Sequence, residues 1–169
     1  MLFRSLLPEQ VPDIPGLEIR AAYETFDRVG GDLYDFQPLS LSGSELRNDP
    51  NQPWAILISD ASGHGPSAAV VAAMLHAILH AYPTVPNGPA EILRHANDQL
   101  AKKRIESSFI TAFLMFYDPV SRKLTYSCAG HPPPLLKVSL GPGPVKELLC
   151  DDGIPLGIME GAQIGRAHV

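Results

Sequence analysis

The junction at residues 54–82 constrains the fold more than any other stretch. "WAILISDAS" (54–62) is a nearly continuous apolar run, typical of a strand buried on both faces, and it stops at Asp60. "GHGPSAAVVAAMLHAILHAY" (63–82) follows at once. It predicts a largely buried helix, because Pro66 suits a first turn and alanine has the highest helix propensity. A buried strand and a buried helix are therefore expected to meet at a glycine-rich bend.

The other predicted elements lie on both sides of this junction. Alternating or apolar segments predict strands at 17–25, 29–39, 108–118, 123–130, 133–139 and 145–150. The first two of these predict a hairpin. A second helix is predicted at 90–104, with one face formed by Ile92, Leu93, Ala96 and Leu100. Strands, then two helices, then more strands indicate an α+β sandwich rather than a doubly wound parallel sheet.

Length and charge exclude several classes of protein. The 169 residues fit one domain, and the net charge of −5 lacks the basic footprint of a nucleic-acid binder. No stretch reaches the ~20 apolar residues of a membrane span, and "MLFRSLLP" is too short for a signal peptide. Cys128 and Cys150 form no C-x-x-C pair, so both are expected to be buried thiols in a reducing compartment. Cytoplasmic localisation is the expectation.

Three aspartates lie in two predicted strands, two of them at strand ends beside glycine-containing stretches. Asp60 ends the apolar run before "ASGHG", while Asp32 and Asp35 follow two glycines in "VGGDLYDF". If these strands are neighbours, two or three carboxylates converge, and clustered carboxylates repel one another unless a cation neutralises them. Oxygen-only ligands suit Mg²⁺ or Mn²⁺. The alternative is that these are turn-forming aspartates, and Asp35 in "YDF" is equally compatible with a solvent-facing position.

Five motifs resemble one known family. They are "LLPEQVPDIPGLEIRAAYE", "VGGDLYDF", "ISDASGHGPSAAVVAAML", "SFITAFLMFYDPVSRKLTYSCAGHPPPLL" and "DGIPLGI". They occur in the order found in the PPM-type protein serine/threonine phosphatases, in the bacterial branch typified by RsbU and the stage II sporulation protein E. The resemblance covers about residues 6 to 159.

The resemblance implies both a fold and a metal centre. The fold is a four-layer αββα sandwich of two antiparallel sheets flanked by helices, with two Mn²⁺ or Mg²⁺ ions between the sheets. A metal-activated water attacks phosphorus in line, without a phosphoenzyme. By motif position, Asp32 and Asp60 are metal ligands, with Asp60 bridging both ions, and the backbone carbonyl of Ala61 also ligates. The glycines expected to let the backbone approach this site are Gly30, Gly31, Gly63 and Gly65.

The histidines divide into three groups. His64, in "GHG", is a candidate catalytic general acid, and ordering of the loop and helix start is the equal alternative. His131, in "AGHPP", is expected to make a structural hydrogen bond, with a substrate contact as the alternative. His76, His80 and His95 lie on predicted helices and are not expected to be ligands.

The chain also departs from the family pattern. That pattern continues beyond "GIPLGI" to a "TDG"-like motif whose aspartates complete the metal site, whereas Asp151 and Asp152 in "DDG" are interpreted as turn residues. The expected organisation is a linker helix end and entry segment at 1–16, a partial phosphatase domain at 17–160, and a tail at 161–169 unlike the family. Weak or absent activity of this chain alone is expected, because hard-cation affinity depends on ligand count. Assembly through unpaired sheet edges is also expected.

Two functions follow from these observations. The leading hypothesis is a phosphatase acting on phosphoserine or phosphothreonine in a partner protein. By resemblance, this partner is a STAS-type anti-sigma factor antagonist in a bacterial stress or developmental switch, with a sensor or receiver domain upstream in the parent protein. The alternative is a non-catalytic regulatory or scaffold module that binds a STAS-like or kinase partner. A different metallohydrolase is disfavoured for lack of histidine-rich ligand spacing.

Overall fold

The structure is a computed structural model that describes residues 6–24, 30–39, 49, 51–83, 86–103, 108–137, 142–149, 153–165 and 167–168. Its elements, in chain order, are β1 (Asp32–Pro38), β2 (Trp54–Ala61), α1 (Pro66–His80), α2 (Pro89–Lys103), β3 (Ile110–Asp118), β4 (Lys123–Ala129), β5 (Leu135–Lys137), β6 (Val145–Glu147) and β7 (Ala167–His168).

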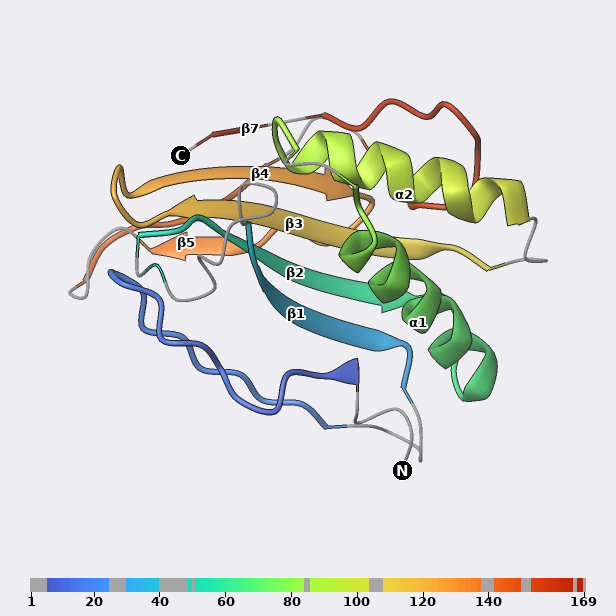
Figure 1. Ribbon diagram of the computed structural model, residues 1–169, viewed down its shortest axis with the longest axis horizontal. Helices are drawn as coiled ribbons and strands as arrows, with labels where there is room; N and C mark the ends of the chain where they lie inside the picture. The colour runs from blue at the N-terminus through green and yellow to red at the C-terminus, as the bar shows by residue number, and fades with distance from the viewer. Residues whose placement is uncertain are drawn as a thin grey trace.

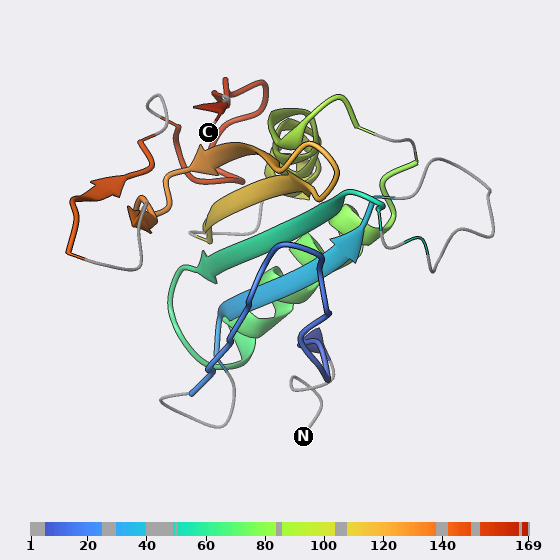
Figure 2. The ribbon, with the colours of Figure 1, turned by 90° about the vertical axis from the view of Figure 1, so that its left-hand side faces the viewer.

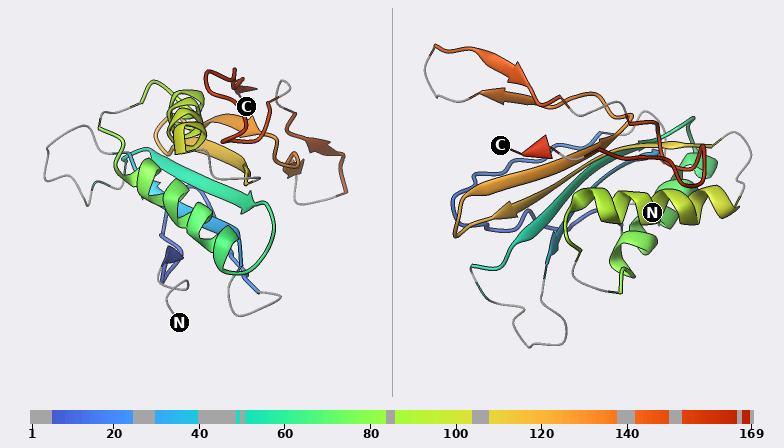
Figure 3. Two further views of the ribbon diagram at one scale, coloured as in Figure 1. Left: turned by 90° about the vertical axis from the view of Figure 1, so that its right-hand side faces the viewer. Right: turned by 90° about the horizontal axis from the view of Figure 1, so that it is seen from above.

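The strands form one larger sheet and one small ribbon. The larger sheet is five-stranded and antiparallel throughout, in the order β1-β2-β3-β4-β7. Strands β5 and β6 pair antiparallel as a separate two-stranded ribbon that projects from the side of the molecule (Figure 3). The predicted α+β class with antiparallel sheets is confirmed.

Both helices cover the same face of the larger sheet (Figure 1). The predicted apolar face of α2 is confirmed, because Ile92, Leu93, Ala96 and Leu100 are all buried. These side chains join Leu75 of α1 and the inward-facing residues of the strands in one core cluster. Burial of this apolar surface is the main force that holds the helices on the sheet.

The N-terminal segment 6–24 runs along the opposite face of the sheet (Figure 2). Ile14 is 1 % exposed and packs with Ile56 and Tyr117, and the Tyr117 hydroxyl donates to the Pro15 carbonyl oxygen at 3.1 Å. The predicted strand at 17–25 is wrong over its described part, because residues 17–24 join no strand and form no hairpin with β1. Leu17 and Ile19 pack against the cluster on this sheet face, while Glu18 and Arg20 are exposed, which gives the start of the segment its alternation.

Strand β2 corrects the expectation of burial on both faces. Ala55, Leu57 and Ser59 are buried toward the helices, whereas Ile58, on the other face, is 48 % exposed. The N-terminal segment covers Ile56 but leaves this face partly open further along the strand. An open stretch is thereby left between Ile56 and the end of β2 at Ala61.

The C-terminal residues pack on the sheet. Ala162 and Ile164 are each 4 % exposed, and β7 pairs with β4. The boundary placed at residue 160 stays a prediction. Cys128 is buried as expected, while Cys150, Asp151 and Asp152 lie outside the described residues. Among the described helices, none has the length and hydropathy needed to cross a membrane.

Candidate active site

The end of β2 and the start of β1 bring two carboxylates together. The antiparallel register places Asp32 directly opposite Asp60, and both side chains are exposed on the sheet face away from the helices. The pKa of Asp60 is raised, first by partial burial, then by the neighbouring charge of Asp32 and by a hydrogen bond between the two side chains. The strands that carry the two motifs are therefore neighbours, as the metal-site prediction requires.

This carboxylate pair suits a hard cation. Partial burial and then the charge of Asp32 raise the pKa of Asp60, so the fully ionised pair is disfavoured without a cation. A divalent ion would remove the repulsion between the two charges while leaving both groups ionised. Since all the donors are oxygens, the set fits Mg²⁺ or Mn²⁺ better than a softer metal.

Gly31 brings the backbone of β2 close to the start of β1. The Ala61 amide donates to the Gly31 carbonyl oxygen at 3.2 Å. A Cβ on Gly31 would lie 2.8 Å from the Ala61 carbonyl oxygen and 2.9 Å from the Ala68 Cβ. Only glycine allows this approach without displacing the backbone, so the Ala61 carbonyl lies beside the strand that carries Asp32.

The bend between β2 and α1 depends on left-handed backbone. Gly63 and Gly65 adopt φ values of 88° and 75°, a region that other L-residues rarely occupy. The helix consequently begins at Pro66 rather than at residue 63. His64 lies exposed between these glycines and makes no hydrogen bond within the described part of the chain. Its two interpretations, general acid or loop-ordering residue, stay predictions.

A polar row continues from the aspartates onto β3. Thr111 lies opposite Asp60 in the register, and its hydroxyl oxygen is 2.9 Å from the Nδ1 of His131. The predicted structural hydrogen bond of His131 is confirmed. Burial lowers the pKa of His131, and the charge of Asp32 opposes that shift. Sequence reasoning missed Thr111, whose only signal is a hydroxyl in the apolar strand sequence "FITAF".

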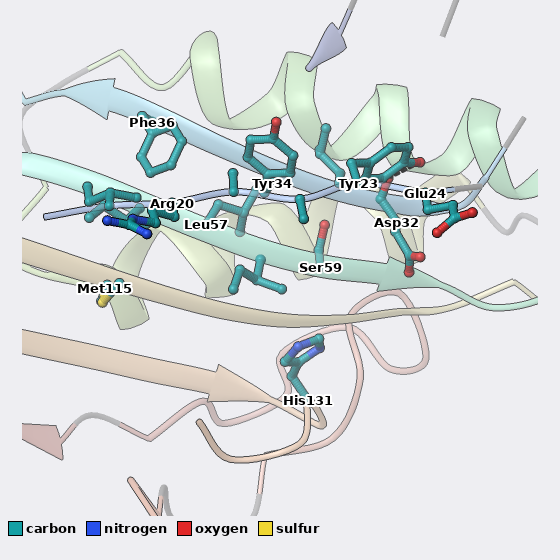
Figure 4. A pocket seen from close by; sticks show the side chains of 16 residues that line it. Arg20, Tyr23, Glu24, Asp32, Tyr34, Phe36, Leu57, Ser59, Met115 and His131 are labelled. Carbon is teal, nitrogen blue, oxygen red and sulfur yellow. Dashed lines mark hydrogen bonds between the residues drawn. The ribbon is translucent and has the colours of Figure 1, made fainter. Parts of the chain in front are cut away.

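An elongated groove leads away from Asp32. It has a volume of about 470 Å³ and lies between the N-terminal segment and the sheet face (Figure 4). Its walls include Tyr23, Tyr34 and Phe36, and His131 also lines it. The Tyr23 hydroxyl donates to the Asp32 carbonyl oxygen at 3.1 Å, which links the N-terminal segment to the carboxylate pair. A mainly apolar wall beside paired acids suits a ligand with both apolar and charged parts.

Asp35 does not join this site. It is 9 % exposed and faces the helices, with its Oδ2 atom 2.6 Å from His80 Nε2 and 3.8 Å from His76 Nε2. Two carboxylates, those of Asp32 and Asp60, therefore lie near Ala61, and not three. Residues 32 and 35 are an odd number apart on one strand, so their side chains point to opposite faces. The solvent-facing interpretation of Asp35 is wrong as well.

Three solved structures share this fold. The structure containing the RsbU and RsbW domains of a Mycobacterium tuberculosis protein has a TM-score of 0.62, is 22 % identical, and is matched over 85 % of this chain and 37 % of that one. The PP2C phosphatase domain of Bacillus subtilis SpoIIE has a TM-score of 0.62 at 17 % identity, over 82 % of this chain and 37 % of that one. RsbX in complex with magnesium has a TM-score of 0.57 at 17 % identity, over 84 % and 62 %. The fold is therefore that of the PP2C-type phosphatase domains.

The family follows from the sequence match. Residues 50–169 match the model of the Stage II sporulation protein E (SpoIIE) family, and the chain belongs to this family. Phosphoserine phosphatase RsbP of Bacillus subtilis (strain 168) is 24 % identical over 148 residues, which cover 85 % of this chain. The match spans 34 % of that relative, so the chain corresponds to about a third of its length.

Proposed function

We propose that this chain is part of a metal-dependent protein serine/threonine phosphatase. The observation that carries the proposal is the pairing of Asp32 with Asp60 at adjacent strand ends, in a member of the SpoIIE family. The relative RsbP is named a phosphoserine phosphatase, and the PP2C domain of SpoIIE has the same fold. Family and site thus support the same chemistry.

The residues that would hold the ions are Asp32, Asp60 and the backbone carbonyl of Ala61. Two bound Mg²⁺ or Mn²⁺ ions would supply an acidified water as nucleophile and neutralise charge on the phosphoryl group. The donors fit such ions because they are oxygens on two rigid strands, and the RsbX structure was determined with magnesium.

The remaining residues of the site position these groups or move protons. Burial and then the neighbouring charge of Asp32 raise the pKa of Asp60, and a bound ion would favour its ionised form. Thr111 lies beside Asp60 on β3, and its hydrogen bond with His131 fixes the orientation of both side chains. His64, exposed at the bend before α1, is the candidate that would protonate the departing serine or threonine oxygen.

The proposed substrate is a phosphorylated STAS-type protein. Support comes from the resemblance and from the relatives, which include RsbP, the RsbU and RsbW domains, and a stressosome protein. The mainly apolar groove that begins at Asp32 would accept the chain beside a phosphorylated residue. A sensor or receiver domain in the parent protein, self-association through sheet edges and a cytoplasmic location belong to the same proposal.

A non-catalytic regulatory or scaffold module is the second candidate. Within the described residues, the site brings together two carboxylates and one backbone carbonyl, and a low ligand count lowers the affinity for hard cations. A chain that binds its phosphoprotein partner without turnover would fit this arrangement.

Turnover of a phosphoserine peptide with Mn²⁺ separates the two candidates. An enzyme predicts Mn²⁺-dependent phosphate release that falls by about a hundredfold or more in Asp32→Asn, because removal of a metal ligand costs more than loss of its supporting contacts. The matched control is Asp13→Asn, which changes an exposed carboxylate elsewhere. Peptide binding without phosphate release in the wild type would establish the scaffold instead.

A further inference from the structure

We propose that Asp35, His76 and His80 form a second metal site, selective for zinc-like divalent transition ions. One ligand atom from each of these residues lies within 4.8 Å of the other two. The site joins β1 to α1 on the helix-covered face of the sheet, whereas Asp32 and Asp60 lie on the other face. It does not depend on the proposed phosphatase function.

The helix places the two imidazoles correctly for a shared ligand. His76 and His80 are four residues apart on α1, so they project from the same face of the helix. Their rings stack with centroids 4.1 Å apart and an interplanar angle of 26°. Both Nε2 atoms approach the same oxygen, Asp35 Oδ2. Two histidines at this helical spacing, completed by a carboxylate from another element, form a recurrent zinc-binding arrangement.

The carboxylate of Asp35 is already oriented. Its Oδ1 atom accepts a hydrogen bond from the Phe36 amide at 2.8 Å, which directs Oδ2 toward the histidines. Such an orienting hydrogen bond is what metal-ligating carboxylates have in known sites. The Asp35 side chain is 12 % exposed, and a nearly buried carboxylate needs a cation beside it. The His80 side chain is 40 % exposed, so an ion and its water ligand can enter from solvent.

The distances fit an ion after small movements. Ligands at zinc distances in a tetrahedron lie about 3.3 Å apart. The two Asp35 Oδ2 to Nε2 distances, 2.6 Å for His80 and 3.8 Å for His76, lie on either side of that value. Two nitrogens and one oxygen favour Zn²⁺, Co²⁺ or Ni²⁺ over Mg²⁺.

Occupancy would fasten α1 to β1. Asp32 begins β1, and the bend that follows Asp60 leads directly from β2 into α1. An ion on the helix side would therefore hold the strand that carries Asp32 to the helix that follows Asp60. A ligand that binds only the folded chain raises its melting temperature in proportion to the logarithm of its concentration. Zn²⁺ is therefore expected to stabilise the protein.

The test is a Zn²⁺ titration of the chelator-stripped chain in excess Mg²⁺, followed by competition with a chromophoric chelator. Co²⁺ absorption then reports the coordination geometry. We expect one Zn²⁺ per chain, a rise in melting temperature, and affinity reduced at least about tenfold in His76→Gln and His80→Gln. The controls are His95→Gln, a histidine on the other helix, and Asp60→Asn, which removes the paired aspartate. Both are expected to leave the Zn²⁺ affinity unchanged.

Two results would overturn this site. One is a wild-type affinity for Zn²⁺ equal to that of His80→Gln, with both proteins folded by circular dichroism in chelator; Asp35 and His80 would then form an ion pair only. The other is loss of Zn²⁺ binding in Asp60→Asn, which would place the ion at the paired aspartates. Because the His80 side chain is half exposed, His80→Gln remains informative even if a substitution at Asp35 prevents folding.

Discussion

The two faces of β1 show how partners decide what a carboxylate does. Asp32 and Asp35 lie three residues apart on the same strand, yet Asp32 meets another carboxylate while Asp35 meets two imidazoles. Burial and then the charge of Asp32 raise the pKa of Asp60, whereas the pKa of His80 is raised chiefly by its hydrogen bond to Asp35. Without a cation, the charges of Asp32 and Asp60 therefore repel each other on one face of β1. On the other face, Asp35 attracts the imidazole of His80.

The largest expected effect on stability concerns the backbone packing beside Asp32 and Asp60. Gly31→Ala is expected to destabilise the fold by about 1–3 kcal/mol, because its Cβ would meet backbone that cannot move freely. Chemical denaturation measures the change, and Gly161→Ala is the control, since a Cβ there meets no atom within 4 Å. Gly161 has a φ of 73°, so the control reports backbone strain without the clash. Equal losses of unfolding free energy in the two variants would show that the backbone at Gly31 does not need to approach Ala61 closely.

The next largest effect on stability concerns the pair formed by Asp35 and His80, and it depends on pH. In chelator, His80→Gln is expected to cost on the order of 0.5–1 kcal/mol, since a half-exposed histidine is screened by solvent. The folded pKa of His80 is raised above 6.5, so the pair's stabilisation is complete below that pH and is lost as pH rises through the folded pKa. His76, whose pKa is lowered, faces the same carboxylate and is present in both proteins.

Urea denaturation at about pH 5.5 and about pH 8.5 checks the direction of this pH dependence of stability. The account predicts that wild type and His80→Gln differ more at the lower pH. A difference that grows with pH would show that His80 is not held in its charged form by Asp35.

The smallest expected effect has the opposite sign. Asp60→Asn is expected to stabilise the metal-free protein near pH 7 by on the order of 0.5 kcal/mol, a modest value because Asp60 is mostly solvated. A carboxyl whose folded pKa is raised above 3.8 favours the folded state only at low pH and opposes it once ionised. Differential scanning calorimetry in chelator measures the shift. A lower melting temperature for Asp60→Asn would mean that the pair is not repulsive.

Much of the fold could be predicted from the sequence because its elements are strongly patterned. The helix at 90–104 and the strands at 54–62 and 108–118 were each found within three residues of their observed ends. The segment 17–24 could not be assigned correctly, since alternation on a sheet face and alternation within a ladder give the same sequence pattern. The partial exposure of β2 was missed because it depends on the path of that segment.

The residues of the candidate sites also fall into those that the sequence could predict and those that it could not. Asp32 could be found because it follows a glycine pair, and Asp60 because it ends an apolar run just before a glycine-rich bend. The register then places them opposite each other. The arrangement of Asp35 with His76 and His80 was missed. The spacing of the two histidines is visible in the sequence, but only the packing of α1 on β1 shows that they face a carboxylate.

Calorimetric titration with Mn²⁺ tests the central claim, that the paired aspartates of adjacent strand ends bind a divalent ion. The wild-type chain and Asp13→Asn are predicted to give the same binding isotherm, and Asp60→Asn is predicted to lose the heat of binding. His80→Gln is predicted to bind Mn²⁺ as the wild type does. Superimposable isotherms for the wild type and Asp60→Asn would contradict the claim and leave Asp60 as a residue of the turn alone.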